Sequence, residues 1–296
     1  MVDVKIRTLL TLSEMGSYTK TAEALSLTQP AVSHHIKLLE EEFGIHIFVK
    51  GKHTLKPTAA GEILINYARR AMALSNGVRQ AIEDCQRQIH SLRLGITPTA
   101  SDIVGPQVLA AYCSDHSEIS IQILRDSIKN IDSMLAFYEL DFAIVDGMIR
   151  RDGFSSMLLG TDYLGLVVSP RHPFARRMSV RLDEIQQENM VMRPKGAETR
   201  RMFESYVISN GYLPRDFHVS MELDSVSNIK EIVMADLGIS VLSHNVCLDE
   251  LKRGQLVIVP IENCQMVRSI NLIYPDDFSA PAVLQDIRRK YEEHFN

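Results

Sequence analysis

Several polar side chains on one face of a predicted helix could read the edges of nucleic acid bases. The helix follows the segment SLTQP, and its outward positions hold four such residues: Gln29, Ser33, His34 and Lys37. A Gln side chain can pair with adenine, Ser with several base edges, and Lys with guanine or phosphate. This spacing favours a helix that lies in the major groove with its first residues at the bases. A plain helical bundle with solvated polar faces is the alternative.

Two residues define the start of this helix. Thr28 is predicted to cap it, and Pro30 falls in its first turn, where a missing N–H costs nothing. The apolar residues Val32, Ile36 and Leu39 recur at helical spacing and are predicted to face inward. DNA would therefore meet the opposite, polar face, and Thr28 and Pro30 are counted among the predicted contacts.

The neighbouring residues predict a small module around this helix. Two short helices are expected at residues 6–16 and 19–25, and the pattern IFVKGKHTLK at 47–56 predicts a hairpin. The hairpin carries three side chains that could grip the flanking DNA backbone as a wing: Lys50, Lys52 and His53. The adjacent His34 and His35 would point about 100° apart, so they are predicted to contact bases or phosphates rather than to share a metal ion.

The charge of the chain is unevenly distributed. Residues 1–90 carry 11 Lys and Arg against 9 Asp and Glu, whereas residues 91–296 carry 21 against 28. A locally basic segment on an acidic body suits an N-terminal module that meets a polyanion and a larger part that does not.

The longest predicted helix covers residues 59–89, with Thr58 as its N-cap. Small and apolar residues repeat in it at heptad spacing, with Leu64, Ala71, Val78 and Cys85 at one position and Tyr67, Leu74 and Ala81 at the other. This pattern favours a linker that pairs two copies of the chain. The alternative is an ordinary helix packed on its own domain.

After His90 the pattern alternates between strands and helices, which predicts βαβ units and a mainly parallel sheet. Strands are predicted at residues 92–96, 119–124, 142–145, 164–168, 190–192, 219–223, 239–242, 256–259 and 270–274. Helices are predicted at residues 102–113, 131–138, 199–209, 226–235, 246–251 and 282–294.

The whole chain resembles a known family of regulators. GSYTKTAEALSLTQPAVSHHIKLLEEEFGIHIFVK, followed by TAAG at 58–61, resembles the winged helix-turn-helix of LysR-type transcriptional regulators. LRLGITPTASDIVGP, LDFAIVDG, RPKGAETRRMFE and ADLGISVLS are similar to landmarks of that family's effector-binding domain. The resemblance implies an α+β chain with a winged helix-turn-helix at 1–58, a linker and dimerisation helix at 59–90, and a periplasmic-binding-protein-like α/β domain at 91–296. Its two subdomains would be residues 91–161 with 266–296, and residues 162–265.

The resemblance also implies a function. A homodimer or homotetramer would bind double-stranded DNA sequence-specifically, under the control of a small metabolite in the C-terminal cleft. No catalytic activity and no cofactor beyond that co-inducer are implied, and RNA polymerase is a further candidate partner. The chain has neither an apolar signal segment nor a run of about 18 apolar residues, so we expect a cytoplasmic protein without membrane contact.

A ligand site is predicted where helices start after strands. Ligands of open α/β sheets bind at the carboxyl ends of strands, near the free N–H groups of helix N-termini. Hydroxyl-rich turns at such places give eight candidate residues: Thr97, Thr99, Ser101, Ser127, Asp146, Gly196, Thr199 and Ser225. The family motif points most directly to Thr99. Acidic residues nearby argue for a monocarboxylate, an amino acid or another small metabolite, and plain helix capping is the alternative for each hydroxyl.

Other classes of protein find less support in the sequence. An enzyme built on the α/β part would need a recognisable motif, but a nucleophile elbow, phosphate loop, dinucleotide fingerprint and zinc-protease motif are all missing. A solute-binding protein with a helical anchor would need a signal peptide. The four cysteines, Cys85, Cys113, Cys247 and Cys264, are far apart, which predicts reduced and mostly buried thiols, with a redox-sensing pair as the alternative.

Overall fold

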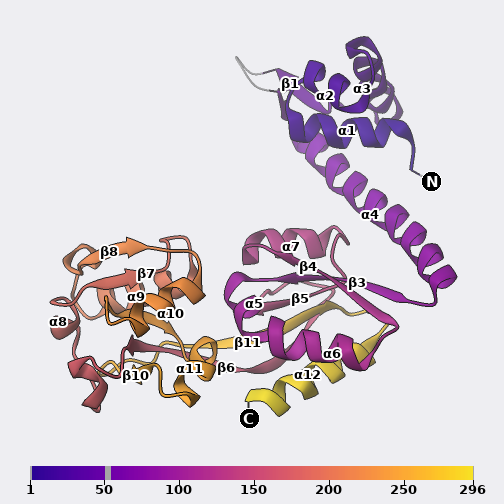
Figure 1. Cartoon of the computed structure of the whole chain (residues 1–296). Helices are drawn as coiled ribbons and strands as arrows, with labels where there is room; N and C mark the ends of the chain where they lie inside the picture. The colour runs from indigo at the N-terminus through magenta and orange to yellow at the C-terminus, as the bar shows by residue number, and fades with distance from the viewer. Residues whose placement is uncertain (1, 51–54, 296) are drawn as a thin grey trace. The chain divides into compact units, whose positions relative to one another are not determined.

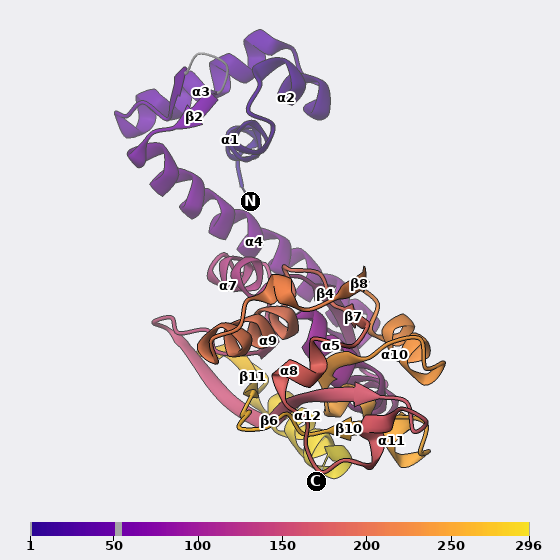
Figure 2. The ribbon, with the colours of Figure 1, turned by 90° about the vertical axis from the view of Figure 1, so that its left-hand side faces the viewer.

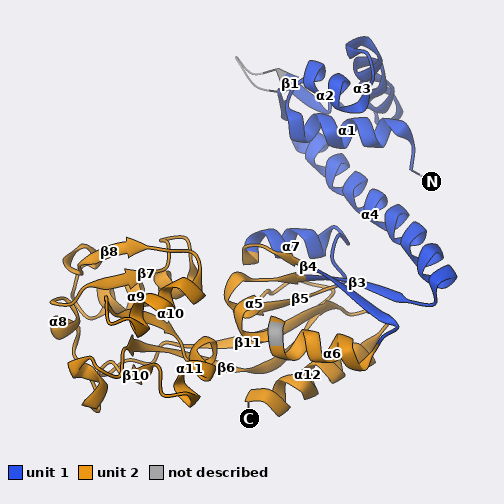
Figure 3. Ribbon diagram, in the orientation of Figure 1, with its two compact units in different colours: residues 1–94, 117–123, 129–141 blue, residues 95–116, 124–128, 142–296 orange. Residues whose placement is uncertain are grey.

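The computed structural model describes residues 2–50 and 55–295. The chain forms two compact units (Figure 3): unit 1 contains residues 1–94, 117–123 and 129–141, and unit 2 contains residues 95–116, 124–128 and 142–296. Lys52 and His53 of the predicted wing lie outside the described residues. No helix in the described part of the chain has both the length and the apolar character that crossing a membrane requires.

The N-terminal module of unit 1 is built from α1 (Val4–Met15), α2 (Tyr18–Leu25), α3 (Gln29–Phe43) and a hairpin of β1 (Phe48–Lys50) with β2 (Leu55–Pro57) (Figure 1). Each helix begins at a side-chain cap, supplied by Asp3, Ser17 and Thr28 in turn. Leu9, Leu12, Ile36, Leu39 and Ile47 form its buried core. The predicted helices and hairpin are confirmed to within two residues at most ends, because caps and helical periodicity are local signals.

Helix α4 (Ala59–Arg87) leaves this module as one continuous helix (Figures 1 and 2). The Oγ1 of Thr58 accepts a hydrogen bond from the Gly61 N–H at 2.9 Å and donates one to the His46 carbonyl at 2.6 Å. The first turns of α4 pack Ile65 and Ala68 into the module core. Another face of the helix exposes an apolar row: Ile63, Tyr67, Leu74, Val78 and Ile82.

The contact between α4 and the module leaves no room for a side chain at Gly61. A Cβ placed there would lie 2.1 Å from the backbone oxygen of Ile47. We therefore expect Gly61→Ala to lower the free energy of unfolding by about 1–3 kcal/mol in a urea titration of the full chain, because overpacking outweighs the better helix propensity of Ala. Gly77→Ala in the same helix is the matched control, since a Cβ at Gly77 would meet nothing within 4 Å. An equal effect of the two substitutions would contradict the close approach.

The main sheet contains seven strands in the order β10-β6-β11-β5-β3-β4, with β9 also paired to β6. These strands are β3 (His90–Ile96), β4 (Ile119–Arg125), β5 (Phe142–Asp146), β6 (Phe154–Val168), β9 (Ser240–Ser243), β10 (Val257–Val259) and β11 (Val267–Pro275). Strand β6 pairs antiparallel with β9, β10 and β11, and β11 pairs antiparallel with β5. The prediction of a mainly parallel sheet is therefore wrong for this part of the fold. It missed the first ten residues of β6, which run beside β11.

A second, two-stranded parallel sheet is formed by β7 (Met190–Met192) and β8 (Val219–Glu222). The remaining helices are α5 (Pro98–Val104), α6 (Ala110–Asp115), α7 (Ile128–Ala136), α8 (Leu182–Ile185), α9 (Glu198–Ser209), α10 (Val226–Met234), α11 (Leu248–Lys252) and α12 (Pro281–Phe295). Short turns are η1 (Gly105–Leu109), η2 (Pro173–Arg176), η3 (Pro214–Asp216) and η4 (Asn245–Cys247). The single helix predicted at 102–113 is divided between α5, the π-helical η1 and α6.

None of the four cysteines, all of which the structure describes, forms a disulfide, but the prediction that most are buried is wrong. Cys85 is exposed, Cys113 and Cys264 are partly exposed, and Cys247 is buried. Burial raises the pKa of the Cys247 thiol to about 12, so this side chain stays protonated and unreactive at neutral pH.

Candidate functional site

Helix α3 has one buried and one exposed face. Val32, Ile36 and Leu39 are buried, as predicted. The other face exposes all of the remaining predicted contacts on this helix: Gln29, Pro30, Ser33, His34 and Lys37. The Nζ of Lys37 lies 3.5 Å from Oε1 of Glu41, and both side chains are largely exposed, so this weak pair leaves the ammonium available to another anion.

The two adjacent histidines of α3 have different surroundings. His34 is exposed, whereas Nδ1 of His35 lies 2.9 Å from Oγ1 of Thr8 on α1. The Thr8 hydroxyl donates its proton to the Val4 carbonyl at 3.0 Å. Nδ1 of His35 must therefore carry the proton and donate it to Thr8, since the hydroxyl has only one proton to give. His35 thus joins α3 to α1, and only His34 of the pair is exposed for contact with a partner.

The hairpin that follows α3 has a defined register as far as it is described. Phe48 pairs with Pro57 and Lys50 with Leu55, so Lys50 lies at the end of β1. The hairpin therefore begins where a wing is expected, directly after the helix that would contact the bases.

Unit 2 contains a cavity of about 580 Å³ at the ends of strands and the starts of helices. Five of the eight predicted ligand residues line it: Thr97, Thr99, Ser127, Asp146 and Gly196. They follow β3 and β4, end β5 and precede α9, which is the arrangement expected at the carboxyl edge of an α/β sheet. Ser101, Thr199 and Ser225 do not line it. Ser225 instead caps α10 by accepting a hydrogen bond from the Asn228 N–H at 3.3 Å.

Asp146 at the wall of the cavity is fully engaged within the protein. Its Oδ1 accepts a hydrogen bond from the Thr97 hydroxyl, and its Oδ2 accepts one from Nη1 of Arg268 at 3.0 Å. Nη1 of Arg268 also lies 3.5 Å from Oγ1 of Thr199. Nη2 of Arg268 donates to Oδ2 of Asp162 at 3.0 Å. Arg268, Asp146 and Asp162 therefore form a buried cluster of one cation and two carboxylates beside the cavity. Thr199 contacts this cluster.

Arg193 is a cavity residue that the sequence pattern did not identify. It follows the buried strand β7 and is only 3% exposed. Its Nη2 donates to Oδ1 of Asp224 at 2.9 Å, and its Nη1 lies 3.8 Å from Oδ2 of Asp102. Burial raises the pKa of the Asp102 carboxyl, and the charges of Arg125 and Arg193 oppose this rise. An Arg placed directly after a buried strand was the signal that could have identified Arg193.

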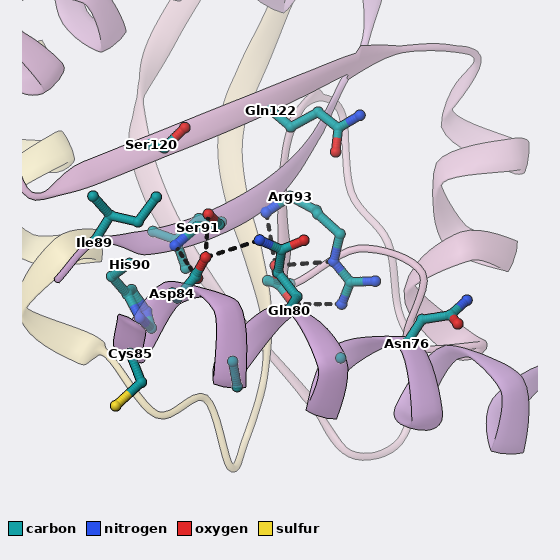
Figure 4. Close-up of a pocket in the computed structure, with 14 residues that line it drawn as sticks. Asn76, Gln80, Asp84, Cys85, Ile89, His90, Ser91, Arg93, Ser120 and Gln122 are labelled. Atoms are coloured by element: carbon teal, nitrogen blue, oxygen red, sulfur yellow. Dashed lines mark hydrogen bonds and ion pairs between the residues drawn. The ribbon is translucent and has the colours of Figure 1, made fainter. Parts of the chain in front are cut away.

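A second cavity, of about 570 Å³, lies in unit 1 where α4 meets β3 (Figure 4). Its most buried polar group, Asp84, accepts hydrogen bonds from Gln80 Nε2 at 2.8 Å and from the Ser91 N–H and hydroxyl at 2.7 and 2.9 Å. Nearby, Arg93 donates to both carboxylate oxygens of Asp141. Burial raises the pKa of Asp84, but the hydrogen bonds from Gln80 and Ser91 outweigh it and leave that pKa below its ordinary value. Asp84 therefore joins α4 to β3, and Arg93 joins β3 to the residue before β5, so these charged groups are engaged within the protein.

Two family models match consecutive parts of the chain. Residues 4–62 match the bacterial regulatory helix-turn-helix protein of the lysR family, and residues 86–296 match the LysR substrate binding domain. The chain belongs to the LysR family. It is a LysR-type transcriptional regulator with a helix-turn-helix for DNA and an effector-binding domain, as the sequence predicted.

Curated relatives of this LysR-type regulator are similar over most of their length. It is 28% identical over 284 residues to a "Probable RuBisCO transcriptional regulator" of Guillardia theta, covering 94% of this chain and 91% of the relative. A protein of the same name from Cyanidium caldarium is 27% identical over 273 residues, which cover 91% of this chain and 86% of the relative.

Solved LysR-type structures share the fold. Full-length OxyR of Pseudomonas aeruginosa aligns with a TM-score of 0.64 at 20% identity, over 99% of this chain and 95% of OxyR. Full-length CbnR in complex with its target DNA aligns with a TM-score of 0.65 at 14% identity, over 99% of both chains. The fold class predicted from the sequence is confirmed by these matches.

Proposed function

We propose that α3 is the recognition helix of this regulator and lies in the major groove of its operator. The observation that carries the proposal is the division of α3 into a buried apolar face and an exposed polar face that begins at a capped N-terminus. Gln29, Ser33, His34 and Lys37 would contact base edges, with Thr28 and Pro30 near phosphate. Lys50, Lys52 and His53 would contact the flanking backbone.

The exposed apolar row of α4 would pair two copies of the chain, giving a homodimer or a homotetramer. Large apolar side chains spaced along one face of a long helix are the usual seam of a two-helix contact. Pairing places two recognition helices on one operator, as DNA-binding dimers require. The proposed domains remain 1–58, 59–90 and 91–296, with the last divided into 91–161 plus 266–296 and 162–265.

The cavity of unit 2 would hold a small metabolite that shifts the regulator between states. Thr97, Thr99, Ser127, Asp146 and Gly196 would line the ligand, while Ser101, Thr199 and Ser225 would hold the surrounding turns. The protein would release this metabolite without converting it chemically, because the family consists of regulators rather than enzymes. RNA polymerase is a proposed partner, and the proposed location is the cytoplasm, where the target DNA would be.

The recognition helix can be tested with His34→Ala, Lys37→Ala as a double variant. Operator sites are first selected from random duplex DNA with the full-length protein, and affinity is then measured over a range of salt concentrations. We expect affinity to fall about tenfold or more, since each base contact contributes about 1–3 kcal/mol, and the salt slope to fall by about 1 if Lys37 meets phosphate. The double variant His218→Ala, Lys252→Ala removes two exposed side chains of unit 2. It is the matched control and should bind DNA like the parent. Unchanged affinity in the α3 variant would overturn the assignment of α3.

A further inference from the structure

We propose that Arg193 is the anchor of the effector cavity and that the effector is a small organic monoanion, held by one carboxylate on this guanidinium. This inference rests on the proposed effector function of the cavity, and it adds the chemical class of the ligand.

Arg193 has a buried donor without a partner. Its side chain is 3% exposed and lines the cavity, and its Nε finds no hydrogen-bond acceptor anywhere in residues 2–50 and 55–295. Buried donors in proteins are nearly always paired, so the unpaired Nε of this cavity-lining residue leaves one acceptor to be supplied, and we assign that acceptor to the ligand. A guanidinium cannot lose its proton, and the acceptor that suits it best is a planar oxyanion group.

The guanidinium can offer a ligand one whole edge. Nε and Nη2 form the side edge of the group, and on this edge only Nη2 is occupied, by Oδ1 of Asp224 at 2.9 Å. The Asp224 side chain is 82% exposed, so its hold on Nη2 is weak and easily exchanged. Asp102 lies at the other end, 3.8 Å from Nη1, and can keep the guanidinium in place. A ligand carboxylate can therefore displace Asp224 and bind Nε and Nη2 together as a bidentate pair.

A helix N-terminus adds to the preference for an anion. Helix α9 is 12 residues long, and its N-cap, Ala197, lines the cavity without providing a side-chain cap. The first N–H groups of a helix carry partial positive charge and bind anions when no side chain caps them. The N-terminus of α9 and the edge of Arg193 therefore both favour a negative charge on the ligand.

The remaining charges limit the ligand to a single negative charge. Asp146 also lines the cavity, and its two oxygens already accept from Thr97 and Arg268, so it would repel a second anionic group. Arg201 and Glu198 both line the cavity and are paired with each other, so together they add no net charge to it. Apolar atoms of Pro98, Ile128 and Pro194 line the same space and suit an uncharged body. A cavity of about 580 Å³ has room for such a small molecule.

The ligand class can be tested on the full-length protein with matched probes. Thermal-shift titrations compare straight-chain and hydroxylated monocarboxylates of two to eight carbons with their primary amides, with the corresponding dicarboxylates and with inorganic phosphate. We expect at least one monocarboxylate to raise Tm by mass action, and its amide, its dicarboxylate and phosphate to give no comparable rise. If neutral or dianionic probes bind and monocarboxylates do not, the ligand class is wrong while the effector function stands. If no probe of any class binds, the effector function of the cavity fails as well.

The anchor is tested with variants against the best monocarboxylate. Arg193→Gln should weaken binding by about 10- to 100-fold, as expected for the loss of charged hydrogen bonds. Arg193→Lys should weaken it less, because it keeps the charge and loses the planar fork. Arg215→Gln, an exposed arginine of unit 2, is the control and should bind like the parent.

A gain-of-function variant keeps the proposal testable even if Arg193→Gln fails to fold. Asp224→Asn removes the weak competitor for Nη2 and should tighten monocarboxylate binding by up to about fivefold. Equal binding by the parent, Arg193→Gln and Asp224→Asn would overturn the anchor and leave the effector function of the cavity intact.

Discussion

Replacing Arg268 with Met is expected to lower the free energy of unfolding of the full chain by about 3–5 kcal/mol. The Arg268 side chain is 4% exposed, and it lies between Asp146, also 4% exposed, and Asp162, which is completely buried. A Met fills the space of the aliphatic part of the side chain but leaves both carboxylates in the interior without their cation. Removing one partner of a buried charge cluster is costly for this reason, even where the cluster as a whole adds little stability.

Urea unfolding at neutral pH measures this effect, with Arg288→Met as the control. Arg288 forms an exposed pair with Glu292 at 2.8 Å, and its loss should cost less than about 1 kcal/mol. The triple variant Arg268→Met, Asp146→Asn, Asp162→Asn should recover part of the loss, because it removes the unpaired charges as well. If Arg268→Met costs no more than Arg288→Met, the cluster does not stabilise unit 2.

Placing two charges on the apolar row of α4 is expected to abolish tight operator binding. Leu74 and Val78 are 57% and 61% exposed, one helical turn apart, and belong to the row that we propose pairs two copies. Leu74→Glu, Val78→Glu would put like charges against each other in that contact. A monomer binds a single half-site, so the operator affinity should fall by about 100-fold or more, the amount that linked binding of two sites contributes.

Sedimentation and DNA binding of the same samples check this result. We expect the Leu74→Glu, Val78→Glu variant to sediment as a monomer with unchanged helix content. Asn76→Glu, Arg87→Gln changes the charge by the same amount on the other side of α4, where the side chains are polar, and should leave the assembly intact. A dimeric Leu74→Glu, Val78→Glu variant with normal affinity would show that α4 is not the pairing surface.

The sequence predicts the N-terminal module well because its signals are local. Thr28 and Thr58 cap their helices as expected, and the buried residues of α3 follow one helical period. Capping also explains why one predicted ligand residue, Ser225, does not line the cavity. Ser225 starts a helix and caps it, so a hydroxyl at a helix start does not by itself identify a ligand residue.

Long-range pairing accounts for what the sequence could not predict. The first ten residues of β6 become a strand because they pair with β11, more than 100 residues later in the chain. Arg268 and Asp162 are charged residues inside those two strands, and only the pairing shows that they meet in the interior. Arg193 likewise finds Asp224 across 31 residues. Periodicity and capping report on neighbours in sequence, so they cannot locate such contacts.

The junction between α4 and β3 has a mechanical consequence. The helix ends at Arg87, and the next residue, Gln88, adopts a left-handed conformation with φ of 55°, a point where the chain direction could change. Asp84 in the last turn accepts two hydrogen bonds from Ser91, on the other side of Gln88, and is itself held on the helix by Gln80. Torsion about Gln88 would break the two hydrogen bonds between Asp84 and Ser91. We therefore expect a displacement of the first residues of β3 to move α4 as a rigid body, because the connection at Gln88 cannot absorb it by bending.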